Sequence, residues 1–196
     1  MKKRRMKKLN NKGYSLVELI IVIAIIVVLT AAAMITMTVM HSAKAKEAAI
    51  TFDSELSELI KNSKSKACDA NVDGKIDDAD EGYSFGIRLH KDGNKCYLQD
   101  VLVKDGLYVQ DDTYEEANNV NDGKGISLSS YVYVKYTDLD GNVITIGENS
   151  GDEVLIAYKK DGTCFSGYGM YEFIRTSGGD QVASMTLNKN GSHKSN

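Results

Sequence analysis

The sequence of 196 residues contains no proline, so none of its helices can carry a proline bend. It has only three histidines, His41, His90 and His193, and none has a cysteine or a second histidine at the spacing of a metal site. The serine-rich segments lack the pattern of a nucleophile elbow. A pairing of Cys164 with His90 as nucleophile and base has no support in the surrounding sequence. We therefore expect a protein that is not an enzyme.

Cysteine is also scarce, with Cys68, Cys96 and Cys164 as its three positions. In an oxidising environment two of them could form a disulfide and leave one free. Cys96 and Cys164 lie in strand-like stretches and are the expected pair. The alternative is three thiols, two of them buried as small hydrophobic side chains.

Acidic residues are missing from the first 13 positions, which carry seven cationic side chains. These are Lys2, Lys3, Arg4, Arg5, Lys7, Lys8 and Lys12. The bias predicts an N-terminus in the cytoplasm and a translocated C-terminal part. The remaining chain keeps 17 of the 24 Lys and Arg against all 27 Asp and Glu, a net charge of −10. This acidic exterior is typical of a cell-surface domain and argues against nucleic acid as the main ligand, although local basic patches could still serve DNA uptake.

The apolar run from Leu19 to Met40 has 22 residues without a formal charge. As a helix it would be roughly 33 Å long, which is enough to cross the hydrocarbon core of a bilayer. Glu18 stands at its edge, where a carboxylate is costly, by at least ~2.5 kcal/mol near a membrane centre. Its presence therefore indicates a specific role.

Residues 13–18, Gly-Tyr-Ser-Leu-Val-Glu, follow the basic leader and precede the apolar run. This segment resembles the prepilin cleavage motif of type IV pilins, type II secretion pseudopilins and competence pilins. The resemblance implies that a prepilin peptidase cuts after Gly13 and methylates the new N-terminus at Tyr14. It also implies that Glu18 meets the N-terminal amine of a neighbouring subunit in a filament, and that an assembly ATPase and a platform membrane protein take part. Tyr14 replaces the commoner Phe, and the family's frequent helix-bending proline is missing.

Two other interpretations compete for the same N-terminal segment. A secretory signal cleaved after the small residues 31–33 would explain the basic and apolar regions, but not Glu18. A plain single-pass anchor explains neither Gly13 nor Glu18. At the level of function, the alternatives to a filament subunit are a membrane-anchored surface-binding module that does not polymerise and, with less support, an enzyme secreted after cleavage at Ala33.

The pattern of the chain predicts an α+β fold in which a long helix packs on an antiparallel sheet, as the pilin resemblance also implies. We expect a leader at 1–13, a transmembrane or filament-core helix at 14–40 and an amphipathic helix at 41–67. An acidic loop at 68–82 then leads to a β head at 83–190 and a frayed polar tail at 191–196. Apolar residues at spacings of three and four mark the amphipathic helix. Asp-Gly pairs at 92–93, 140–141 and 161–162 mark hairpins in a sheet of six to eight strands.

The acidic loop has the spacing of an EF-hand calcium loop over residues 69–80 and resembles a dockerin-type calcium repeat. Oxygen ligands would come from Asp69, Asn71, Asp73, Asp77 and Asp80 and from the backbone carbonyl of Lys75. Gly74 would allow the sharp turn, and Ile76 would anchor the loop to the core. The helix that follows a full EF-hand loop is missing, so a solvated acidic turn is the alternative.

Together these features predict a non-enzymatic subunit of a surface filament, inserted first as a single-pass membrane precursor. The long loop at 111–125 and the late strands favour a minor pilin or pseudopilin with two small sheets. Adhesion, motility, secretion and DNA uptake stay open as its role.

Overall fold

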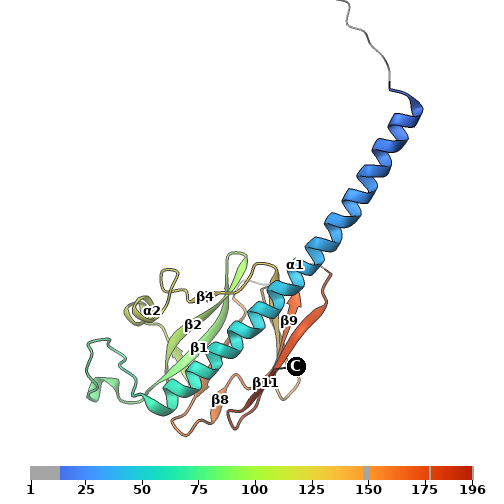
Figure 1. The fold of residues 1–196 in the computed structure, drawn as a ribbon. Helices are drawn as coiled ribbons and strands as arrows, with labels where there is room; N and C mark the ends of the chain where they lie inside the picture. Colours follow the sequence, from blue (N-terminus) through green and yellow to red (C-terminus); the bar gives the residue numbers. More distant parts are fainter. Residues whose placement is uncertain (1–13, 148–150, 177, 196) are drawn as a thin grey trace, which may run out of the picture. The chain divides into compact units, whose positions relative to one another are not determined.

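The structure is a computed structural model that describes residues 14–147, 151–176 and 178–195. The chain divides into two compact units, an N-terminal segment up to Val39 and a head of residues 40–196. Helix α1 (Leu16–Ser65) runs through the boundary between them (Figure 1). Each unit is therefore described by itself.

The N-terminal segment is a continuous helix whose side chains are all exposed between Tyr14 and Val39. Its best 18-residue window has a mean hydropathy of 3.0, and within the described residues α1 is the one helix long and apolar enough to cross a membrane. Three threonine hydroxyls, those of Thr30, Thr36 and Thr38, donate to backbone carbonyls three or four residues earlier. Beyond Glu18 the surface of this segment is apolar apart from these satisfied hydroxyls, which suits lipid or other apolar helices.

The second half of α1 belongs to the head and lies along its strands (Figure 1). One apolar face of this half packs in the core between helix and strands. The predicted amphipathic stripe is confirmed, because five residues at spacings of three and four are buried. They are Ala45, Ala48, Phe52, Leu56 and Leu59. The Phe52 ring lies 4.8 Å from the ring of Tyr171 and 5.6 Å from that of Phe173, measured between centroids. These contacts fix the helix on the inner faces of the strands.

Eleven strands in the described residues form two antiparallel sheets. One sheet has the order β3-β2-β1-β7-β8, and β4 also pairs with β2. Its strands are β1 (Tyr83–Asp92), β2 (Lys95–Lys104), β3 (Leu107–Val109), β4 (Ile126–Ser127), β7 (Glu153–Tyr158) and β8 (Cys164–Ser166). The other has the order β11-β10-β9-β5-β6. Its strands are β5 (Val132–Thr137), β6 (Val143–Ile146), β9 (Gly169–Arg175), β10 (Gln181–Leu187) and β11 (His193–Ser195).

The loop at 111–125 covers the outer edge of β2. It contains helix α2 (Asp112–Asn118). Asp111 caps the N-terminus of this helix, because its side chain accepts a hydrogen bond from the Tyr114 amide. Between β3 and β4 the Asn119 side chain takes the place of a strand: its Oδ1 accepts from the Asp100 amide at 2.7 Å, and its Nδ2 donates to the Asp100 carbonyl at 2.8 Å. An uncovered strand edge invites pairing with other chains, so this loop has a protective structural role.

The expectation of a frayed tail is wrong at its end. Residues 193–195 form β11, which pairs with β10, and His193 Nε2 lies 3.2 Å from the Asp53 carboxylate of α1. The polar composition of this segment obscured a strand that is held by backbone pairing and by side-chain contacts of His193 and Ser195 to α1.

The predicted Cys96–Cys164 disulfide is also wrong, because the three cysteines are free and buried. Cys96 is on β2 and Cys164 on β8, three strand steps apart in the sheet order, which is about 14 Å at the usual spacing. They also differ by about six residues along the strands, since Cys96 pairs with Lys91 and Cys164 with Tyr158. A disulfide requires Cα atoms within about 7 Å. Burial raises the pKa of both thiols to about 11, so they remain protonated hydrophobic side chains.

Candidate functional site

The N-terminus of α1 is closed by two reciprocal hydrogen bonds between Ser15 and Glu18. The Ser15 amide donates to Glu18 Oε2 at 2.8 Å, and the Glu18 amide donates to Ser15 Oγ at 3.2 Å. This arrangement is a capping box, which satisfies amides that have no partner inside the helix. The carboxylate also lies at the positive end of the helix dipole.

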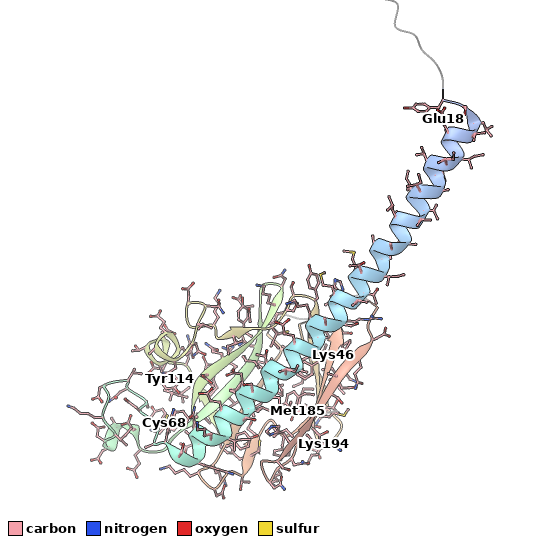
Figure 2. The ribbon with its side chains drawn as sticks, viewed as in Figure 1. Glu18, Lys46, Cys68, Tyr114, Met185 and Lys194 are labelled. Carbon is pink, nitrogen blue, oxygen red and sulfur yellow. The ribbon has the colours of Figure 1, made fainter. Side chains whose placement is uncertain are left out.

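Glu18 therefore serves its own helix even before any partner is considered (Figure 2). Its Oε2 is taken up by the Ser15 amide, and Oε1 is left to meet another donor. Sequence reasoning missed Ser15, although the spacing Ser-x-x-Glu before an apolar run is a recognised signal for such a cap. Tyr14 is 86% exposed, whereas Gly13 and the cationic leader lie outside the described residues.

The first half of the loop at 69–80 is built from side chains that accept backbone amides. Asp69 accepts from the amides of Asp73 and Gly74, at 3.2 and 2.9 Å. Asn71 Oδ1 accepts from the Asp73 amide at 3.2 Å, and Asp73 Oδ1 accepts from the Lys75 amide at 2.8 Å. Gly74 has a φ of +81°, a conformation that side chains rarely adopt. The side chains at the first, third and fifth positions of the loop thus each accept a backbone amide of the turn.

The second half of the loop is fixed by Asp80, which is only 6% exposed. Its two carboxylate oxygens accept from the amides of Asp77 and Ala70, at 3.0 and 2.7 Å. The bond from the Asp77 amide is the main cause that holds the pKa of Asp80 below its usual value. Asp77 in turn accepts from the Ala79 amide at 2.8 Å and caps a short 3-10 turn. Asp80 therefore ties both ends of the loop together.

The predicted anchor of this loop is wrong. Ile76 is 57% exposed, and the loop is held to the head through Cys68 and Ala70 instead. These two residues pack with Leu102 of β2 and Tyr114 of α2 in a small separate core. An apolar residue at the eighth position of an EF-hand loop normally meets a second loop or helix, and the chain continues here directly into β1.

The donor set of the loop suits a hard cation in part. Five side chains offer only oxygen, the ligand that Ca²⁺ prefers, and Asp73 and Asp77 each use one carboxylate oxygen in the bonds above. Asp69 and Asp80 engage both oxygens, each of which keeps a second lone pair. In the described ranges no three His, Cys, Asp or Glu side chains converge closely enough to hold a metal ion without movement. A bound ion would have to draw these oxygens inward.

An acidic cleft of about 240 Å³ lies between the second half of α1, the loop and β2. Four carboxylates line it: Glu55, Glu58, Asp69 and Asp100. Burial, with the charges of Glu55 and Glu58, raises the pKa of Asp100 to about 6. Burial and Glu58 also raise the pKa of Glu55. Among the described residues, Lys66 is the one cationic residue in the lining.

One group of residues in the head has the composition of a catalytic triad but not its geometry. Ser57 Oγ and Asp53 Oδ1 both face the same nitrogen of His193, Nε2, at 3.4 and 3.2 Å. A triad needs the serine and the carboxylate on opposite ring nitrogens. The arrangement therefore fastens β11 to α1 and gives no basis for nucleophilic catalysis.

Comparison with known proteins identifies the N-terminal segment. Residues 8–34 match the family model of the prokaryotic N-terminal methylation motif. This match covers the Gly13–Glu18 segment and most of the apolar run, and it ends before the head begins. No curated protein and no solved structure matches the chain.

Proposed function

We propose that this protein, whose N-terminal methylation motif and α+β architecture make it type IV pilin-like, is a minor pilin or pseudopilin in a surface filament. A prepilin peptidase removes residues 1–13 and methylates Tyr14. The apolar part of α1 then moves from the membrane into the filament core, and the acidic head faces solvent. Other pilin subunits are its direct partners, and an assembly ATPase with a platform protein drives extraction.

The observation that carries this proposal is Glu18 at the N-terminal end of an exposed apolar helix. Among the described residues, the Ser15–Glu18 capping box occupies Oε2 and leaves Oε1 without a donor, and the cut after Gly13 creates an amine on Tyr14. A charged carboxylate in an apolar environment needs a paired cation, and the amine of an axially displaced neighbour meets that need. A helix that only anchored a head would use this carboxylate for the capping box alone and would have no cation to pair with its charge.

The competing function is a membrane-anchored surface-binding module that does not polymerise. It shares the apolar helix and the exposed head, and it too could be processed by the peptidase. It differs in requiring no contact between Glu18 and another subunit, so variants at Glu18 separate the two functions.

The experiment compares Glu18→Ala with Glu47→Ala in cells that assemble the filament. Glu47 is a suitable control, because it is an exposed acid of the same helix, in a surface ion pair with Lys44 that contributes at most about 1 kcal/mol. We expect both variants to be cleaved and methylated at Tyr14, and only Glu18→Ala to be missing from sheared filaments. Normal incorporation of Glu18→Ala would refute the filament role, and a mature N-terminus at Met34 by mass spectrometry would refute the pilin reading altogether.

We also propose that residues 69–80 bind one Ca²⁺. The ligands would be the side chains of Asp69, Asn71, Asp73, Asp77 and Asp80 with the carbonyl of Lys75. Support comes from the alternation of oxygen donors and from the tight turn at Gly74. A divalent ion would also reverse the mutual repulsion of four aspartates in a short loop.

A further inference from the structure

Two hydroxyl groups near the C-terminal end of α1 are buried without a hydrogen-bond partner among the described residues. They are Tyr158 Oη on β7 and Ser63 Oγ on α1. Tyr158 is fully buried and Ser63 is 4% exposed. Burial also raises the pKa of Tyr158, so its hydroxyl keeps its proton. Leaving a buried hydroxyl unpaired costs about 1–3 kcal/mol, so two such groups in one region require an explanation.

A small cavity lies between these two residues. Its volume is about 30 Å³, and its lining includes Ser63, Tyr158, Cys68 and Ser84. Figure 2 shows Cys68 beside the C-terminal end of α1, which places the cavity where the helix leaves the sheets. A single water needs about 10–15 Å³ of such space and at least two polar partners. The cavity is large enough for one water, both residues with an unpartnered hydroxyl line it, and it is too small for an organic ligand of the usual size.

We propose that the cavity holds one structural water molecule that bridges Tyr158 Oη and Ser63 Oγ and so joins α1 to β7. The water donates to or accepts from each hydroxyl, and either direction is open because both groups can rotate. The Ser84 hydroxyl is already used in a bond of 3.2 Å to the Val103 carbonyl, so it is at most a further acceptor. The water completes a polar contact that the two side chains cannot make directly.

A mutant series on the full chain in detergent gives opposite signs for a wet and a dry cavity. If water bridges the hydroxyls, Tyr158→Phe and Ser63→Ala each take one partner from it and lower the melting midpoint, by about 2–6 °C. If the cavity is dry, each substitution removes an unpaired buried hydroxyl and raises the midpoint. The bridge also predicts that the double variant loses less than the sum of the two single losses.

Tyr136→Phe is the matched control. Its hydroxyl donates directly to the Tyr168 carbonyl at 2.8 Å, so its loss calibrates the effect of one tyrosine hydrogen bond. We expect the drop in Tyr158→Phe to be of similar size. A raised midpoint in either single variant, or strictly additive losses, would overturn the bridge.

A crystal structure of the full chain grown in bromide separates water from an anion. The exposed Lys66 and Lys160 also line the cavity, so a halide is the alternative occupant. Electron density for one atom at hydrogen-bond distance from both hydroxyls, without anomalous signal from bromide, supports the water. An anomalous peak in the cavity, or no density at all, rejects it.

Discussion

Replacing Asp100 by Asn should stabilise the head at pH 7.5 and remove most of the gain in stability on acidification to pH 5. Asp100 lies on β2 in the acidic cleft, opposite Glu55 and Glu58 of α1. Asp69 from the loop lines the same cleft, with Lys66 as its one cationic residue. When every carboxylate is ionised, their repulsion and the burial of Asp100 act against the folded state.

The size of the effect follows from the shift in pKa. Burial and the two glutamates raise the pKa of Asp100 from 3.8 to about 6. At 1.36 kcal/mol per unit, this corresponds to about 3 kcal/mol, an upper limit for a group that keeps some contact with water. Because the folded state holds the Asp100 proton more tightly than the unfolded state, the contribution of Asp100 to stability is greatest below pH 4 and is lost as the pH rises through 6. Against a typical unfolding free energy of ~5–15 kcal/mol, the change is easily measured.

The assay is urea unfolding of the full chain in detergent at pH 5.0 and pH 7.5, followed by tyrosine fluorescence. We expect the native protein to be at most about 1.4 kcal/mol more stable at pH 5.0 through Asp100, and Asp100→Asn to be nearly equally stable at both. Glu116→Gln is the control, since Glu116 is an exposed acid of α2. Equal pH dependence in the native protein and in Asp100→Asn would refute the reasoning.

Two further predictions concern the loop and the edge of β2. Millimolar calcium should raise the melting midpoint of the protein, with about 2.7 kcal/mol of added stability at a hundredfold excess over Kd. Asp73→Ala should abolish this rise. Asp78→Ala is the control, because Asp78 has no ligand role in the proposed site, and it should keep the rise. An unchanged melting curve together with no heat of binding would leave the loop as an acidic turn. Asn119→Asp should lower the stability by about 2–3 kcal/mol, because it removes two donors that face the carbonyls of Asp100 and Glu115. Asn118→Asp removes a single hydrogen bond, from Asn118 Nδ2 to the Tyr114 carbonyl, and should lower the stability less than Asn119→Asp in the same melting experiments.

The helix and most strands could be predicted from the sequence because their signals are local. The change from an apolar run to a stripe at spacings of three and four is visible in α1, and it ends at Ser65, within two residues of the expected boundary. Alternation along β5 appears directly as buried Val132, Val134 and Tyr136. The Asp-Gly pair at 92–93 marks the β1–β2 turn as expected.

What could not be predicted depends on which strands become neighbours. Both cysteines of the expected disulfide are in strands of one sheet, and only the strand order shows that two other strands separate them. β11 is polar, and its partner is chosen by the fold rather than by its own pattern. The strand-like stretch between the Asp-Gly pair at 161–162 and residue 176 divides at Gly167 and Tyr168, and its two parts, β8 and β9, join different sheets. The acidic cleft likewise joins carboxylates that are up to 45 residues apart along the chain.

The cleft and the proposed calcium loop share the carboxylate of Asp69, and this should couple proton binding to calcium binding. Asp69 accepts two amides of the loop and also lines the cleft with Asp100. A calcium ion on Asp69 would cancel part of the negative potential that keeps Asp100 protonated, and would lower the pKa of Asp100. By linkage, the proton on Asp100 must then weaken calcium binding by the same factor.

Urea unfolding at saturating calcium should therefore show a smaller stability difference between pH 5.0 and pH 7.5 than urea unfolding in chelator. Binding calorimetry on the native protein should give a weaker affinity for calcium at pH 5.0 than at pH 7.5. In Asp100→Asn no proton is exchanged at this position, so the calcium affinity should change less with pH. If calcium leaves the pH dependence untouched while it binds, the ion does not reach Asp69, and the ligand set has to exclude that residue.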